Sequence, residues 1–135
     1  MKAYTLVTAL QAAADAHKEE VDRFGAPYIW HVTRVVGMVY SEDERIVAAL
    51  HDVYEHGHDV RAPEHLSHSL DLITRKDSDT YAEYIQKLKH DTVARRVKMA
   101  DLKDHLFDWE SLPLSLASRY IKAYHVLKEV EDALH

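Results

Sequence analysis

Four side chains of this sequence have the types and the spacing of a divalent-metal site. His31 comes first, the adjacent pair His51-Asp52 follows, and Asp101 lies much further along the chain. They offer two imidazoles and two carboxylates, a donor set that suits Mn²⁺, Fe²⁺, Co²⁺, Ni²⁺, Zn²⁺ or Mg²⁺ and that lacks soft sulfur. A divalent ion bound there polarises a phosphoryl group and lowers the pKa of water. The set therefore predicts the chemistry of phosphate-ester hydrolysis.

Each of these residues taken alone has an ordinary structural explanation. A His-Asp dipeptide occurs by chance in many proteins, and a core histidine bonded to a carbonyl explains His31 as well as ligation does. All four positions lie among small and aliphatic residues, however, as in the segment 48–53. A buried Asp is costly unless a charged partner or a metal compensates it. Asp52 and Asp101 together therefore favour a metal site.

The composition indicates one ordinary globular domain. The 135 residues fit a single domain that buries roughly two-thirds of its unfolded surface. Three Gly and three Pro leave little material for the turns of an all-β protein. The net charge of −6 argues against a stable nucleic-acid partner, because counterion release needs clustered Lys and Arg. The absence of Cys excludes a thiolate site and suits a reducing cytoplasm.

The hydropathy pattern predicts a soluble protein. The first residues open into an amphipathic pattern rather than the apolar run of a signal peptide, and no segment reaches transmembrane length. We therefore expect a cytoplasmic protein with no membrane partner. Eleven histidines raise the expectation of a metal site. Four of them lie in polar neighbourhoods and are interpreted as surface residues: His65, His68, His90 and His135.

Apolar residues recur at helical spacing along nearly the whole chain. The pattern predicts an all-α fold, a single domain over residues 1–135 with six or seven helices. The expected helices span about 3–17, 27–39, 41–57, 63–74, 79–89, 91–112 and 115–134. Pro27 suits a first helical turn. Ser41 and Glu44 have the spacing of a capping box, and Asp91 can cap the helix that follows it.

These helices place the candidate ligands where they can meet. His31 is expected in mid-helix, the His51-Asp52 pair near the C-terminal end of the next helix, and Asp101 within a third. Ligands from three packed helices can converge in the core of a helical protein. A helix that continues past Asp52 would also place Glu55 on the same face as the pair.

With these residues in view, the chain resembles the HD phosphohydrolase superfamily, whose metal ligands are one His, a later His-Asp pair and a distant Asp. Within it, the chain is similar to the hydrolase domains of bacterial Rel/Spo alarmone enzymes and their small stand-alone relatives. The likeness covers roughly residues 12 to 105. It rests on five segments: Ala16-His17, Pro27-Tyr28-Ile29-Trp30-His31, Ala48–Glu55, Leu72–Lys76 and Val93–Asp101.

The resemblance implies roles for five residues, and neighbouring positions add four further candidates. One divalent ion, with Mn²⁺ favoured, would be held by His31, His51, Asp52 and Asp101. Glu55 and His56 are the candidate catalytic residues, with Glu55 as the acid that handles the water. His17, Lys98 and His105 are the candidate substrate-binding residues. The implied partner is a small phosphorylated compound such as a nucleotide.

The sequence also departs from the alarmone hydrolases. His56 stands where those enzymes have Asp, acidic residues at 19–22 stand where they have basic ones, and His105 replaces an Asn. These changes predict that guanosine tetraphosphate is a poor substrate compared with simpler nucleotides. They leave the four metal-binding positions intact.

Several alternatives stay open. The domain could be a catalytically weak or inactive HD domain that serves as a nucleotide sensor or interaction module, or a helical partner-binding protein with incidental histidines. Lys98 either neutralises a phosphate or lies on a solvated face, and for Arg95 and Arg96 we favour solvation. His56 and His58 could belong to a separate zinc site, although Gly57 between them more simply marks a helix end. The amphipathic C-terminal helix could pack in a homo-oligomer.

Overall fold

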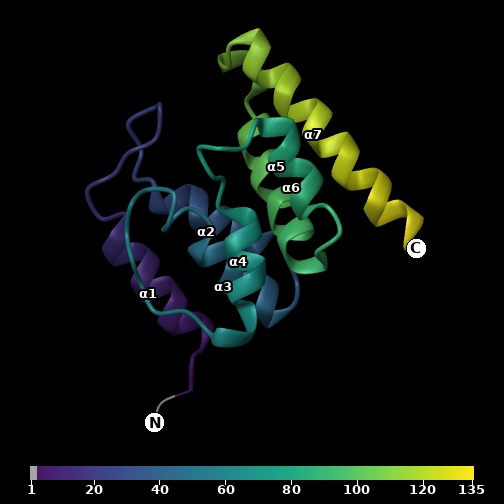
Figure 1. Cartoon of the computed structure of the whole chain (residues 1–135). Helices are drawn as coiled ribbons and strands as arrows, with labels where there is room; N and C mark the ends of the chain where they lie inside the picture. Colours follow the sequence, from purple (N-terminus) through teal and green to yellow (C-terminus); the bar gives the residue numbers. More distant parts are fainter. Residues whose placement is uncertain (1–2) are drawn as a thin grey trace.

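The computed structural model describes residues 3–135, and its regular elements are helices, which confirms the all-α prediction (Figure 1). The α-helices are α1 (Leu6–Ala16), α2 (Ile29–Gly37), α3 (Glu42–Leu50), α4 (Ser67–Ile73), α5 (Tyr81–Leu88), α6 (Thr92–Leu106) and α7 (Leu114–Ala133). Two short 3₁₀ turns are η1 (Glu64–Leu66) and η2 (Trp109–Ser111). None of the helices in this range has the length and apolarity needed to cross a bilayer.

Side-chain caps explain where four of the helices begin. Thr5, Ser41, Thr80 and Asp91 each accept a hydrogen bond from the backbone N–H three residues later, at the starts of α1, α3, α5 and α6. Such a cap satisfies one of the N–H groups that a helix start leaves without a partner. The prediction of Ser41 as a cap is confirmed. The reciprocal half of the box is absent, because the Glu44 side chain is buried and faces Arg96 instead.

Helix α3 forms the centre of the molecule. Every residue from 46 to 50 is buried, so this helix has apolar contacts on all sides. It packs against α1, α2, α4 and α6, while α7 covers the outer side of α5 and α6 (Figure 1). The adjacent small side chains of Ala48 and Ala49 let neighbouring helices approach closely. A helix held in this way fixes the position of whatever follows its C-terminal end.

The helix expected over 41–57 is shorter than predicted. It ends at Leu50, and residues 51–57 form a series of turns. His51 Nδ1 lies 2.6 Å from the Ala48 carbonyl oxygen, and the His58 N–H bonds to the Val53 carbonyl at 3.1 Å. Gly57 adopts φ +84°, a left-handed conformation that glycine tolerates best, and reverses the chain.

Two other helix ends also differ from the prediction. The helix that starts in the 25–27 segment begins at Ile29, because the Pro27 carbonyl first closes a turn with Trp30. Helix α6 ends at Leu106 rather than at the Leu112-Pro113 step, and η2 fills the interval. The four histidines interpreted as surface residues are exposed, as predicted: His65, His68, His90 and His135.

The solvated interpretation of Arg95 is wrong. Its side chain is 1% exposed, because α7 lies over this face of α6 and supplies Glu131. Arg95 Nε lies 2.9 Å from Glu131 Oε1, and Arg96 Nη2 lies 3.1 Å from Oε2. Burial raises the pKa of the Glu131 carboxyl, but the hydrogen bonds from Arg96 and Arg95 outweigh it and hold that pKa at about 2. This ion pair fastens α7 to α6.

The substitution Glu131→Gln should destabilise the protein by about 2 kcal/mol at pH 7, because it leaves the buried Arg95 guanidinium without its counter-charge. A depressed carboxyl pKa stabilises the fold above the unfolded-state pKa, and this gain disappears as the pH falls towards the folded-state value. The difference between wild type and variant should therefore shrink between about pH 4.5 and pH 2. Urea unfolding at several pH values measures it, with Glu129→Gln on the exposed side of α7 as the control. Equal stability of all three proteins at pH 7 would contradict this account.

Candidate metal centre

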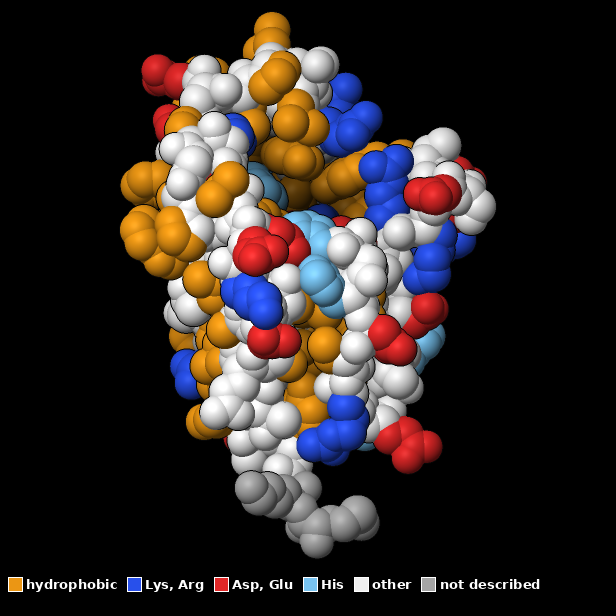
Figure 2. Space-filling view, turned by 90° about the vertical axis from the view of Figure 1, so that its left-hand side faces the viewer, with side chains coloured by type: hydrophobic (Ala, Val, Ile, Leu, Met, Phe, Trp, Pro, Cys, Tyr) orange, Lys and Arg blue, Asp and Glu red, His pale blue; other side chains and the backbone are white. Residues whose placement is uncertain are grey.

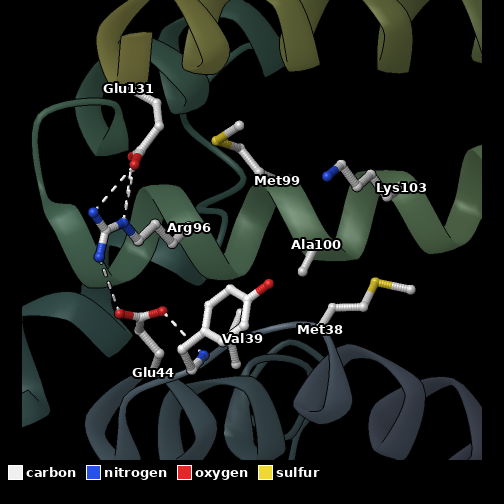
Figure 3. Close-up of a pocket in the computed structure, with 9 residues that line it drawn as sticks. Met38, Val39, Glu44, Arg96, Met99, Ala100, Lys103 and Glu131 are labelled. Carbon is white, nitrogen blue, oxygen red and sulfur yellow. Dashed lines mark hydrogen bonds and ion pairs between the residues drawn. The ribbon is translucent and has the colours of Figure 1, made fainter. Parts of the chain in front are cut away.

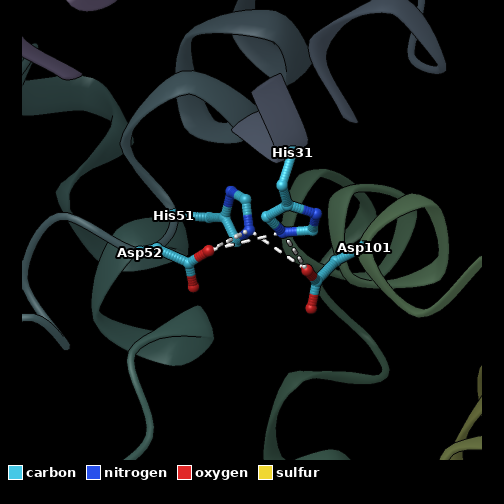
Figure 4. A group of neighbouring side chains, drawn as sticks. All are labelled: His31, His51, Asp52 and Asp101. Atoms are coloured by element: carbon cyan, nitrogen blue, oxygen red, sulfur yellow. Dashed lines mark hydrogen bonds and ion pairs between the residues drawn. The ribbon is translucent and has the colours of Figure 1, made fainter. Parts of the chain in front are cut away.

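The structure brings the four predicted ligands together in one buried group (Figure 4). His31 comes from α2, the His51-Asp52 pair follows the last residue of α3, and Asp101 comes from α6. Each offers one ligand atom, and these atoms lie within 4.8 Å of one another. All four residues are buried, so the group can hold a metal ion in the interior of the protein.

The four side chains point their ligand atoms at a common position. His51 Nε2 lies 2.9 Å from Asp52 Oδ2 and 3.2 Å from Asp101 Oδ1. His31 Nε2 lies 3.0 Å from the same Asp101 oxygen and 3.5 Å from Asp52 Oδ2. Two ring nitrogens thus face two carboxylate oxygens.

The other ring nitrogen of each histidine is occupied. His51 Nδ1 bonds to the Ala48 carbonyl, and His31 Nδ1 lies 2.6 Å from Asp104 Oδ2. Both partners are acceptors, so Nδ1 carries the proton in each ring and Nε2 faces the group. His31 Nε2 is buried and has no hydrogen-bond partner with suitable geometry among the described residues. A buried nitrogen left in this way fits a metal ligand, which also needs a hydrogen bond at its opposite nitrogen.

The group strongly favours positive charge at its centre. Burial disfavours the imidazolium form, yet the neighbouring carboxylates of Asp101, Asp104 and Asp52 raise the pKa of His31 to about 11. The pKa of His51 rises to about 10, against the effect of burial, because of Asp52 and Asp101. Although burial acts in the opposite direction, the pKa values of both aspartates lie well below the usual range, owing chiefly to His51 for Asp52 and to Lys98 for Asp101. The carboxylates therefore attract positive charge, from protons or from a divalent ion.

Asp104 is a residue at the candidate site that the sequence analysis missed. Its carboxylate accepts from His31 and also from Arg34, whose Nε and Nη2 lie 2.7 and 3.0 Å away. Its spacing in the sequence could have indicated it, because Asp104 lies three residues after Asp101 on the same helix and therefore on the same face. A carboxylate behind a ligating histidine holds the ring in place and makes it a stronger base.

Lys98 is not on a solvated face. Its side chain is 12% exposed, and Nζ lies 2.8 Å from Asp101 Oδ2, the oxygen that does not face the histidines. The ammonium group also lies 5.3 Å from the centre of the Tyr84 ring. Burial disfavours the charge, but Asp101 more than offsets it, and the pKa of Lys98 is raised. Lys98 is therefore positioned at the group as a fixed cation.

The two candidate catalytic residues lie in different surroundings. The Glu55 carboxylate accepts a hydrogen bond from the Arg75 backbone N–H at 2.6 Å. Desolvation raises its pKa even though the residue as a whole is exposed, and the Asp52 charge adds to this effect. Because α3 ends at Leu50, a continuous helix does not place Glu55 as predicted. His56 is paired with Glu20 and lies outside the four-residue group.

Three aromatic side chains complete the surroundings. His105 Nε2 lies 3.3 Å from Asp101 Oδ1, and its ring stacks on Tyr120, so His105 is at the group as expected. His17 is buried but contacts Glu20 rather than the four ligands. The Tyr28 hydroxyl donates to Asp52 Oδ2 at 2.6 Å, a role that the sequence analysis did not anticipate.

A pocket of about 820 Å³ opens beside the group. Tyr28, His31 and His105 line its inner end, and Phe24 and Phe107 contribute exposed aromatic rings to its walls. Figure 2 shows a hollow with hydrophobic side chains in its depth, Lys or Arg side chains on one rim and histidine side chains at its lower edge. The buried group therefore has access to a space large enough for a small-molecule ligand.

A second pocket, of about 560 Å³, has a different character (Figure 3). It lies between α6, α7 and the segment that follows α2, with Met38 and Met99 on its walls. Its carboxylates, Glu44 and Glu131, are both paired with Arg96. The acidic groups here are already neutralised, so this pocket lacks the donor set of the buried group.

No protein-family model matches the chain, and no curated protein is significantly similar to it in sequence.

The substitution Asp104→Asn should weaken divalent-metal binding by about 10- to 100-fold while leaving the four ligands in place, because His31 loses the carboxylate that orients its ring. Isothermal titration with Mn²⁺ measures the affinity. The matched control is Asp108→Asn, which changes an exposed aspartate in the segment after the same helix. Unchanged Mn²⁺ affinity in Asp104→Asn would show that this carboxylate only binds Arg34.

Proposed function

We propose that this protein is a metal-dependent phosphohydrolase of the HD type, which acts on a nucleotide or a related phosphate ester or pyrophosphate. The observation that carries the proposal is the buried convergence of two imidazoles and two carboxylates, His31, His51, Asp52 and Asp101, next to a pocket. Phosphate-ester hydrolysis is a reaction for which proteins use such nitrogen and oxygen donors around a divalent ion.

The donor set fits a divalent ion with Mn²⁺ favoured. Half of the ligand atoms are carboxylate oxygens, which hard ions prefer, and the other half are imidazole nitrogens. When bound, such an ion polarises a phosphoryl group and lowers the pKa of water. The four residues hold it, while Asp104 and Lys98 fix the orientation and the charge of the ligands.

Neighbouring residues supply the remaining chemistry. Glu55 follows the ligand pair closely and has a raised pKa, which suits a group that accepts a proton from the attacking water. Lys98 and His105 both contact Asp101, and we assign them to bind a phosphate there. We keep His105 as a candidate phosphate contact and do not assign His56 a proton transfer.

The pocket favours a nucleotide among phosphate compounds. Phe24 and Phe107 are 61% and 91% exposed and can stack against a base. The Arg23 guanidinium lies 4.7 Å above the Phe24 ring and lines the same pocket. A ligand with an aromatic base and an anionic phosphate matches this combination of aromatic rings, the Arg23 guanidinium and a buried candidate cation site.

The alternative is a nucleotide sensor with weak or no turnover. The observation that favours it is the engagement of Glu55, whose carboxylate already accepts the Arg75 N–H. A sensor would bind nucleotides in the same pocket and release no product.

A screen of phosphomonoesters, nucleoside polyphosphates and cyclic nucleotides with added Mn²⁺ tests the proposal. We expect hydrolysis of at least one nucleotide, loss of that activity in Asp52→Ala, and slow hydrolysis of guanosine tetraphosphate by comparison. Asp77→Ala, at an exposed position, is the control. Nucleotide binding without product would favour the sensor. If the protein neither binds nor hydrolyses any of these compounds, both functions are refuted.

The substitution Glu55→Gln should keep metal and substrate binding but lower kcat by about 10²-fold or more, the effect of removing a general base. Gln is nearly isosteric with Glu and can still accept the Arg75 N–H. Parallel measurements of metal content, ligand affinity and kcat separate the roles, with Glu64→Gln as an exposed control. If kcat is unchanged, another group takes the proton. If the metal is lost, Glu55 is a ligand.

A further inference from the structure

A second cluster of metal-binding side chains lies outside the four-residue group. It consists of His17, Glu20, His56 and His58, which we call the histidine–glutamate cluster. His17 Nδ1 lies 3.0 Å from Glu20 Oε1, and His56 Nδ1 contacts the same oxygen. His58 Nε2 lies 3.0 Å from the other oxygen, Oε2. Ligand atoms of His17, Glu20 and His56 lie within 4.8 Å of one another.

The backbone holds this cluster in place. The Glu20 N–H bonds to the His17 carbonyl at 3.0 Å, and the Glu20 carbonyl accepts the Tyr28 N–H at 2.9 Å. On the other side, Gly57 reverses the chain between His56 and His58, so that both imidazoles reach one carboxylate. Because these contacts fix the chain on both sides, the side chains are organised before any ligand arrives.

Charge balance and burial point to a cation. A single carboxylate needs one cationic partner, yet three imidazoles surround Glu20. The His17 side chain is fully buried, and its Nδ1 faces the Glu20 carboxylate. The carboxylate and the other two imidazoles are each about one-third exposed, which leaves a path for an ion to enter.

We propose that the histidine–glutamate cluster is a second divalent-metal site, selective for Zn²⁺ or a similar nitrogen-preferring ion. Three imidazoles and one carboxylate form a nitrogen-rich set, which suits zinc in four-coordinate sites. The four-residue group has equal numbers of nitrogen and oxygen ligands and therefore a different preference. The second ion ties the end of α1 to the turns that carry His51 and Asp52, so its role is structural. The proposal is independent of the proposed hydrolase activity.

Metal stoichiometry tests the proposal without reference to activity. The full chain is stripped with a chelator, dialysed against Zn²⁺ and analysed for bound metal by mass spectrometry. We expect two equivalents in the wild type, one in Glu20→Gln, one in Asp52→Ala and none in the double variant. Glu19→Gln, at the exposed neighbouring position, should retain both equivalents. Circular dichroism checks that each variant is folded.

A second measurement covers the case in which a variant does not fold. Co²⁺ in a four-coordinate site absorbs visible light strongly. In the Asp52→Ala background, which removes the four-residue group, this absorption should be lost with the conservative change His58→Asn and retained with His68→Asn, an exposed control. A single equivalent of Zn²⁺ in the wild type that Glu20→Gln leaves unchanged would overturn the second site. If instead the four-residue group does not bind metal, the wild type should hold one equivalent of Zn²⁺, and among the single variants only Glu20→Gln should lose it.

Discussion

The arrangement of this molecule depends on the compensation of two buried negative charges. Asp52 and Asp101 are 8% and 2% exposed, and an isolated carboxylate in such surroundings is strongly unfavourable. His31 and His51 face them from one side, and Lys98 contacts Asp101 from the other. These contacts join α2, α6 and the end of α3. The charges of the group are therefore balanced only when the three helices are packed together.

The position of the group follows from the central helix. Because residues 46–50 of α3 are buried and the helix ends at Leu50, the pair His51-Asp52 lies at the border between the packed core and the adjoining pocket. The core fixes the backbone of this pair, and the chain reverses its direction at Gly57, beyond the pair. A longer helix would have kept His56 and His58 from facing the same carboxylate. The loss of regular helix after Leu50 thus brings a second set of imidazoles to the end of α1.

The sequence predicted those features that depend on local pattern. Helical periodicity and capping residues indicated an all-α fold, and the four ligands could be found because each polar residue interrupts an apolar segment. What it missed depends on which helix covers which face. Arg95 looks like a solvated residue until α7 brings Glu131 over it. The remaining omissions are pairings between distant or weakly patterned positions: Asp104 with His31, Tyr28 with Asp52, and Glu20 with His56 and His58.

Tyr28 belongs to both clusters at once. Its hydroxyl donates to Asp52, while the centre of its ring lies 4.8 Å from that of His56 and 5.1 Å from that of His17. Any displacement of the Tyr28 side chain therefore alters its contacts with both clusters. Where occupancy of one cluster changes the affinity of the other, thermodynamic linkage requires the reverse effect to have the same factor. One phenol ring thus joins the two proposed sites.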